Sequence, residues 1–234
     1  MSRRDELAAA LAAVEDRIAA ACDRAGRDRD DLTLIVVTKT YPASDVALLA
    51  GLGVTDVGEN RHPEAERKRD EALALGADVR WHFIGGLQTN KAGAVARYAD
   101  LVHSVDRVKL ARSLDRGAEA AGRRLDCLIQ VDFDTTDPGR AGAVPGEVLS
   151  LAEQVLADCP HLSLAGVMTV APFGQDPAPA FARLQELSAD VRGLHPAATV
   201  ISAGMSGDFE TAIEYGATHL RVGSSILGRR APLQ

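Results

Sequence analysis

Apolar and polar positions follow one another along this chain in a repeating order. In residues 3–25 an apolar side chain recurs at every third or fourth position from Leu7 to Ile18. This spacing predicts one amphipathic helix. Gly26 comes directly afterwards and predicts the end of that helix.

Eight short apolar runs rich in β-branched residues come next, as is typical of strands in a parallel sheet. The predicted strands cover residues 32–38, 54–59, 80–84, 101–105, 125–133, 164–170, 199–203 and 219–227. Helical stretches are predicted between them, at 44–51, 63–75, 91–98, 107–121, 147–157, 179–194 and 208–215.

Strands and helices that alternate in this way predict βα units, and eight such units close a parallel barrel. The sequence therefore predicts an α/β protein, a single (β/α)8 TIM-type barrel with an extra N-terminal helix. One domain is expected over residues 1–234, with the helix of residues 1–26 packed on the barrel. The alternative is an open, doubly wound sheet of fewer strands.

Composition narrows the classes of protein that this chain represents. The 46% apolar and 25% charged residues are globular proportions, and the net charge of −7 argues against nucleic-acid binding. No apolar run is long enough to span a bilayer, and the N-terminal segment lacks the apolar core of a signal peptide. The three cysteines have no metal-ligand spacing, so we expect a reduced, cytoplasmic protein without a metal site. Among them, Cys127 is expected to be a packed core thiol.

In a barrel of this kind, chemistry gathers at the C-terminal ends of the strands. Lys39 follows the first strand, where partial desolvation would lower its pKa and favour attack on a carbonyl to form an imine. The alternative is a surface lysine that reaches water. The Gly/Ser turns at 202–206 and 223–225 suit a phosphate group, although Ser206 is alternatively a helix cap.

Arg221 lies inside the eighth predicted strand and must find an acceptor there. Two roles are open for it: a core ion pair with a barrel carboxylate, or a donor to a ring nitrogen of a ligand, which its fixed charge would keep unprotonated. An imine-forming lysine beside a phosphate cradle fits either a phosphorylated sugar or pyridoxal 5′-phosphate (PLP). A Schiff-base aldolase and a non-catalytic interaction protein therefore remain alternatives at this point.

Several blocks of residues together resemble one family over nearly the whole length. They are VTKTYP at 37–42, GEN at 58–60, WHFIGGLQTNK at 81–91, HSVD at 103–106, GVM at 166–168, SAGMSGD at 202–208 and RVGSSILG at 221–228. In these blocks the chain resembles the YggS/PROSC family of PLP-binding, PLP-homeostasis proteins, which are similar to the N-terminal barrel of alanine racemases. The resemblance implies intracellular PLP homeostasis without an established catalytic turnover.

The resemblance also implies roles for individual residues. Lys39 would carry PLP as a covalent aldimine, and Arg221 would face the pyridine nitrogen. The residues expected around the phosphate are Ser202, Gly204, Ser206, Gly223 and Ser224. Those expected to line the pocket are Asn60, His82 and Met168. The implied partners are PLP and PLP-dependent apo-enzymes, with no nucleic acid and no membrane, and the chain is expected to be a monomer.

Three positions depart from the family pattern: Tyr41 and Arg140 stand where lysine is common, and Gly86 stands where proline is common. The first two departures remove lysines on which a secondary PLP site would depend. The third alters loop stiffness.

An amino-acid racemase-like enzyme of weak activity is the alternative function. It would need a second base, for which the candidates are Tyr41, His82, His103 and Tyr215, because no β-rich second domain follows in this sequence. The charged stretch 64–70 is expected to be a solvated helix face.

Overall fold

Eight parallel strands form the centre of the molecule in a computed structural model, which describes residues 1–134 and 140–228. The strands are β1 (Thr33–Val37), β2 (Asp56–Glu59), β3 (Arg80–Phe83), β4 (Leu101–Val105), β5 (Leu125–Val131), β6 (Leu162–Thr169), β7 (Val200–Ser202) and β8 (His219–Val222). Each pairs in parallel with the next, and β8 pairs with β1, so the sheet closes on itself. The predicted barrel is confirmed, and the open sheet is wrong.

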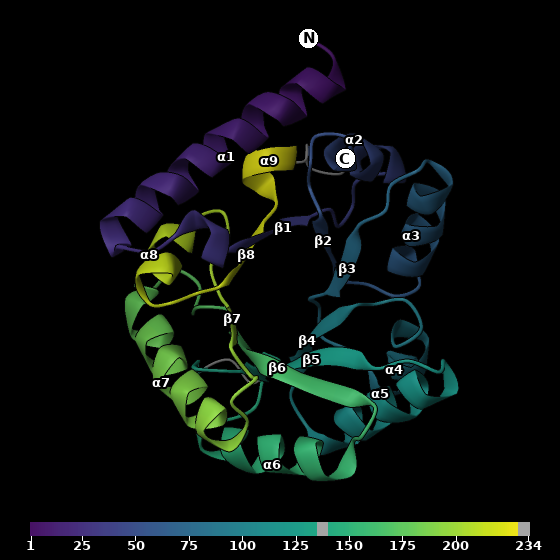
Figure 1. Cartoon of the computed structure of the whole chain (residues 1–234), viewed down its shortest axis with the longest axis vertical. Coiled ribbons are helices and arrows are strands. Elements are labelled where there is room, and N and C mark those ends of the chain that lie inside the picture. Colours follow the sequence, from purple (N-terminus) through teal and green to yellow (C-terminus); the bar gives the residue numbers. More distant parts are fainter. Residues whose placement is uncertain (135–139, 229–234) are drawn as a thin grey trace.

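Helices surround the strands in a ring (Figure 1). They are α1 (Arg3–Ala25), α2 (Ala43–Ala50), α3 (Glu64–Ala74), α4 (Thr89–Val95), α5 (Val108–Ala120), α6 (Val148–Asp158), α7 (Ala178–Leu194), α8 (Phe209–Glu214) and α9 (Ser224–Leu227), with short 3-10 turns at Arg29–Asp31 and Pro145–Glu147. None of the helices in these described ranges is long and apolar enough to cross a membrane.

The eighth predicted strand is too long. It ends at Val222, and residues 224–227 form the separate helix α9. The chain bends at Gly223, where a Cβ would lie 3.1 Å from the carbonyl oxygen of Val37. The apolar pair Ile226 and Leu227, which continues the strand pattern in the sequence, is instead buried on α9.

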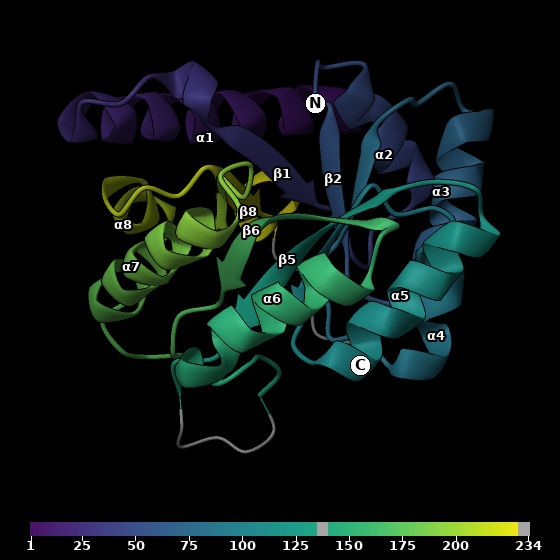
Figure 2. The ribbon, with the colours of Figure 1, turned by 60° about the horizontal axis from the view of Figure 1, so that its bottom comes forward.

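The first helix matches its predicted bounds because both ends carry stop signals. Ser2 caps the N-terminus in a capping box with Asp5, and Gly26 adopts a left-handed φ of 62° at the C-terminus. The helix packs beside α8 and α9, as two views show (Figures 1 and 2). There the Arg17 guanidinium lies 4.4 Å from the centre of the Phe209 ring.

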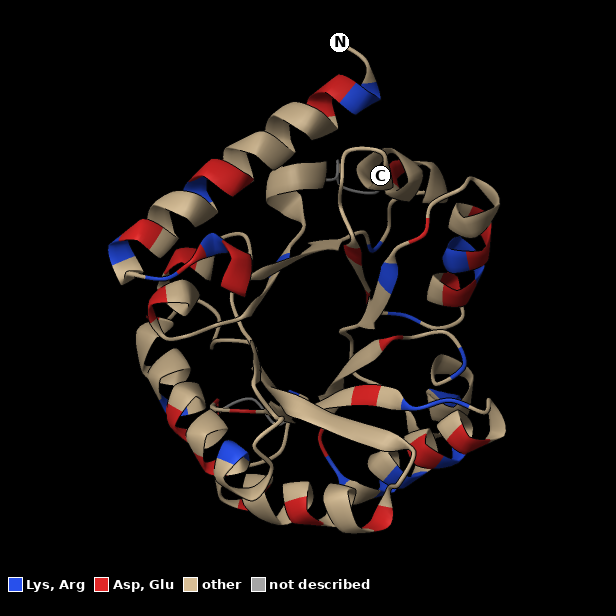
Figure 3. Cartoon of the chain, in the orientation of Figure 1, with Lys and Arg blue, Asp and Glu red and all other residues tan. Residues whose placement is uncertain are grey.

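The main apolar core lies between the strands and the helices, while many charged residues lie on the outer helices (Figure 3). Cys127 is fully buried in this core, and burial raises the pKa of its thiol. The prediction of a packed thiol is therefore confirmed. The barrel interior is filled by a second set of side chains, and these carry the candidate site.

Candidate functional site

A line of polar side chains crosses the inside of the barrel. Successive residues of a strand point to opposite faces, so one residue in two faces inward. Asp56 (β2), His82 (β3), His103 (β4), Ser202 (β7) and Arg221 (β8) all do so, and each touches the next.

The contacts along this line are continuous. Arg221 Nη1 lies 2.5 Å from Ser202 Oγ, and Ser202 Oγ lies 2.9 Å from His103 Nδ1. His103 Nε2 lies 3.0 Å from His82 Nδ1, and His82 Nε2 lies 2.8 Å from Asp56 Oδ1. All five side chains are buried, with residue exposures between 0% and 5%. We call these five residues the axial chain.

The pKa values at both ends of the axial chain are shifted from their ordinary values. Burial alone would raise the pKa of Asp56, but the hydrogen bonds from His82 and Thr55 outweigh it, and that pKa is lowered. Burial lowers the pKa of Arg221 to about 10, and the carboxyl of Asp208 opposes this. Both end groups therefore remain charged near neutral pH, one negative and one positive.

The acceptors of Arg221 differ from those expected for a core ion pair. Its guanidinium donates to Ser202 Oγ and, through Nη2, to the carbonyl oxygen of Thr169 at 2.8 Å. Within the described ranges it makes no salt bridge to a carboxylate within 4.0 Å. The carboxylate of the axial chain is that of Asp56, which lies at the opposite end from Arg221.

The rim turns after β7 and β8 meet at Ser206. The backbone N–H groups of Gly223 and Ser225 both point at Ser206 Oγ. Each backbone nitrogen lies 3.4 Å from that oxygen. Ser206 is therefore not the cap of the following helix: the N-cap position of α8 belongs to Asp208, whose Oδ1 accepts from the N–H of Met205. Gly204 joins the same rim, since its carbonyl accepts from the N–H of Arg221 at 2.9 Å.

Lys39 lies in the turn that follows β1, and its side chain is exposed. The position of Lys39 after a barrel strand predicts partial desolvation of its amine, but the residue is exposed. Hydrogen bonds from the side of helix α3 stabilise the turn itself. Lys68 Nζ donates to the carbonyl oxygen of Thr38 at 2.8 Å and to Glu59 Oε1 at 2.5 Å, and Thr38 Oγ1 also donates to Glu59 at 2.7 Å.

That contact corrects the prediction for the stretch 64–70. Lys68 is buried, with 9% of the residue exposed, so this face of α3 is not wholly solvated. Glu59 points outward from β2 and places its carboxylate where Lys68 reaches it. The pair therefore joins the outer helix α3 to the turn that carries Lys39.

The remaining predicted pocket residues lie at different depths. Asn60 is half-buried directly after β2, where a Cβ on Gly85 would lie 2.2 Å from the Asn60 carbonyl oxygen, so only glycine fits there. Met168 is almost fully buried and packs with Leu101 and Leu128 inside the barrel. Ser224 begins α9 beside Gly223.

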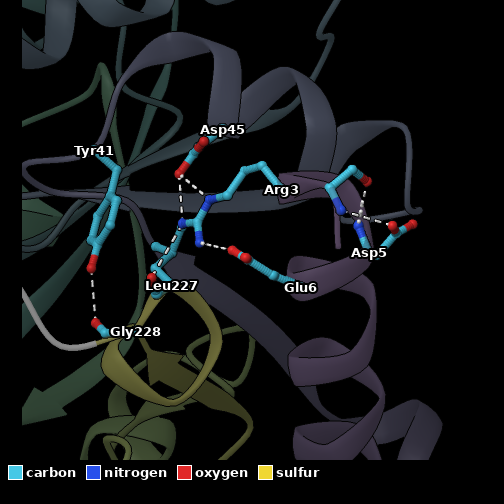
Figure 4. A network of polar contacts seen from close by, with 8 residues as sticks. Arg3, Asp5, Glu6, Tyr41, Asp45, Leu227 and Gly228 are labelled. Carbon is cyan, nitrogen blue, oxygen red and sulfur yellow. Dashed lines mark hydrogen bonds and ion pairs between the residues drawn. The ribbon is translucent and has the colours of Figure 1, made fainter.

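Two of the three positions that depart from the family pattern, Tyr41 and Arg140, make structural contacts. The Tyr41 hydroxyl donates to the carbonyl oxygen of Gly228 at 2.8 Å, and Arg3 reaches Asp45 and the carbonyl oxygen of Leu227 nearby (Figure 4). These contacts connect the segment after Lys39 to the end of α9. Arg140 bonds Asp132 at 3.2 Å and the carbonyl oxygen of Val170 at 2.6 Å.

Part of this arrangement is not predicted by the sequence. The pattern does not single out Asp56, it indicates His103 only as a candidate base, and it places Lys68 on a solvated helix face. The signal that points to the first two is alternation, because both are polar residues at inward positions of barrel strands. No local signal distinguishes Lys68 from its charged neighbours.

Comparison with known proteins gives a consistent match. The family model of the alanine racemase N-terminal domain matches residues 10–231. A protein of Mycobacterium tuberculosis named pyridoxal phosphate homeostasis protein is 42% identical over 97% of this chain and 94% of its own length. The protein of that name from Escherichia coli K12 is 35% identical over 97% of both chains. The chain belongs to the pyridoxal phosphate homeostasis protein family.

Comparison with solved structures agrees with this family. PipY of Synechococcus elongatus, solved with PLP bound, is 31% identical with a TM-score of 0.82, over 95% of this chain and 100% of that one. An alanine racemase of Clostridium difficile shares the fold alone, at 15% identity and a TM-score of 0.73, and this chain covers 58% of it. The curated relatives are named for homeostasis and not for a reaction.

Proposed function

We propose that this chain binds PLP at the C-terminal end of the barrel and acts in intracellular PLP homeostasis. The observation that carries the proposal is the near full-length likeness to PipY, which was solved with PLP bound. Relatives named for PLP homeostasis at 35–42% identity support the same role.

The donor groups at the rim fit the chemistry of PLP. The two N–H groups that converge on Ser206 Oγ, with that hydroxyl, form a donor set suited to a phosphate dianion. Gly204 and Ser224 lie in the same two turns. The buried guanidinium of Arg221 uses two of its five N–H donors on Ser202 and Thr169, which leaves donors for a ring nitrogen.

In this proposal each residue has a stated task. Ser206, Gly223 and Ser224 bind the phosphate, with Ser202 and Gly204 supporting the turn. Arg221 would face the pyridine nitrogen, and Lys39 would hold PLP through an imine between its Nζ amine and the PLP aldehyde, with release of water. The pocket around the ring is lined by Asn60, His82 and Met168. PLP itself supplies an aldehyde and an electron-accepting ring when bound.

We further propose that the chain buffers PLP and passes it to PLP-dependent apo-enzymes as a cytoplasmic monomer. The exposed Lys39 suits transfer, since an exposed amine is open to exchange with an incoming lysine. The three cysteines are all free and buried, which suits a reducing compartment.

A weak racemase-like activity is the second candidate, because the matching family model is that of alanine racemase. Three of the four candidate bases are already engaged. His82 and His103 use both ring nitrogens within the axial chain, and the Tyr41 hydroxyl donates to Gly228. Incubating PLP-loaded protein with single enantiomers of amino acids tests this alternative directly.

Lysine mapping gives a sharp test because the chain has four lysines: Lys39, Lys68, Lys91 and Lys109. The protein is loaded with PLP, reduced with borohydride and digested, and the modified peptide is identified by mass spectrometry. We expect the adduct on Lys39 and its loss in Lys39→Ala.

Lys109→Ala is the matched control, since Lys109 is also exposed but lies on α5. An adduct that persists at full yield in Lys39→Ala, on another lysine, contradicts the assignment of Lys39. A wild-type protein that retains no PLP after desalting contradicts the proposed function itself.

A further inference from the structure

With both histidines neutral, the axial chain has a single direction in which its protons can be arranged. A guanidinium only donates and a carboxylate only accepts, so Ser202 Oγ accepts from Arg221 at one end, Asp56 accepts from His82 at the other, and Ser202 donates its own proton to His103 Nδ1. A ring nitrogen that accepts carries no proton, so neutral His103 is protonated at Nε2 and donates to His82 Nδ1. By the same step His82 is protonated at Nε2 and donates to the carboxylate of Asp56.

Burial favours the neutral form of His103 that this order requires. His103 is fully buried, and burial together with the charge of Arg221 holds its pKa well below the ordinary value. His219 faces the same space from β8, with its ring centre 6.3 Å from that of His82, and burial lowers its pKa to about 4. Asp208 is the carboxyl that acts on Arg221 from the α8 side.

The axial chain therefore joins two opposite charges, Asp56 and Arg221, through Ser202, His103 and His82. Asp56 lies at the N-terminal end of β2 and lines a cavity of about 320 Å³ with Thr55, Glu15 and Arg29. Arg221 lies towards the C-terminal rim, next to the turn that holds Ser206. No carboxylate within the described residues forms a salt bridge with Arg221, and in this order every donor of the axial chain, N–H or O–H, points away from Arg221 and towards Asp56.

We propose that Asp56, His82, His103 and Ser202 are positioning residues that fix the Arg221 guanidinium as a donor towards the ring nitrogen of PLP. Ser202 accepts a hydrogen bond from Nη1 of the guanidinium and so fixes its orientation. The other three residues set the tautomers of the two histidines, which in turn orient the Ser202 hydroxyl. This inference rests on the proposed function, in which Arg221 faces that nitrogen. It assigns a task to His82 beyond lining the pocket, and a task to two residues, Asp56 and His103, outside the predicted site.

The tautomers are measured first, in the full chain without PLP, by nitrogen NMR of the histidine rings at neutral pH. We expect His82 and His103 to be neutral with the proton on Nε2. The single variants His82→Gln and His103→Gln assign the signals. A proton on Nδ1 of His103, or a doubly protonated His82, overturns the proposed order.

The second measurement uses PLP labelled in its ring nitrogen and bound to the wild-type chain and to variants. We expect an unprotonated ring nitrogen in the wild type. In His103→Leu the chain is cut, so the ring nitrogen should gain a proton signal and PLP should be retained about tenfold less tightly, as for one lost bond to a charged group.

Conservative variants separate positioning from folding. His103→Gln offers one acceptor and one donor and should restore the wild-type ring signal, and Asp56→Asn keeps the acceptor for His82 but removes the charge. Leu128→Val is the control, since it changes the barrel interior without touching a polar contact.

The outcomes distinguish this inference from the function on which it rests. If His103→Leu does not fold, Asp56→Asn decides: an unchanged ring signal and affinity there contradict a role for the distant charge. If His103→Leu and His103→Gln both bind labelled PLP like the wild type, the positioning role is wrong while the proposed function stands. If the wild type binds no PLP, the proposed function fails, and the ligand-directed part of this inference fails with it.

Discussion

The barrel interior has two unlike halves. Strands β2, β3, β7 and β8 contribute the axial chain, in which every contact joins a specific donor to a specific acceptor. On the other side, Leu101, Leu128 and Met168 fill the space by apolar contact alone. Strand β4 belongs to both halves, since Leu101 and His103 both face inward. The polar half therefore depends on the pairing of individual atoms, and the apolar half depends on filled volume.

The largest expected effect comes from cutting the polar half. His103→Leu has a similar volume but leaves Ser202 and His82 without their buried partner. An unsatisfied buried polar group costs about 1–3 kcal/mol, so we expect the free energy of unfolding to fall by about 4 kcal/mol. Urea denaturation followed by circular dichroism measures this loss. His103→Gln should lose clearly less, and an equal loss for both variants would show that shape, not pairing, matters at this position.

Much of this comparison could be predicted from the sequence, and part of it could not. The strands are predictable because β-branched apolar runs are spaced as βα units, and Arg221 is recognisable as a charge inside such a run. The axial chain was not found, because Asp56, His103 and Ser202 lie far apart in sequence and meet only when the barrel closes. Lys68 was misplaced because a charged helical stretch has the same composition whether or not one lysine turns inward to Glu59.

A second prediction concerns acid sensitivity, which belongs to the polar half. His219 has a pKa of about 4 in the folded protein, below the ordinary 6.5, mainly because of burial. The unfolded chain therefore binds more protons between these values, so the stability that the neutral ring provides is present above pH 6.5 and is lost as the pH falls towards 4. Because the residue is only half-buried, we expect a loss of about 1 to 2 kcal/mol between pH 7.5 and pH 5.

The lowered pKa of His103 adds to this loss in the same direction. Asp208 acts in the opposite direction, since burial raises its pKa, and it does so at the acidic end of the range. The measurement is therefore a difference: urea denaturation at several pH values for the wild type and for His219→Gln. The variant should show the flatter curve, and parallel curves would remove His219 from the explanation.

The smallest effect is expected in the apolar half. Leu128 is fully buried but touches only apolar neighbours in its cluster, so Leu128→Met conserves volume and leaves no polar group without a partner. Volume-conserving apolar exchanges usually cost less than about 1.5 kcal/mol, and a flexible methionine adapts to the space beside Met168. The same urea titration measures this variant against His103→Leu. A loss as large as that of His103→Leu would mean that the apolar half is also specified by exact shape, and the difference between the two halves would then lie in polarity alone.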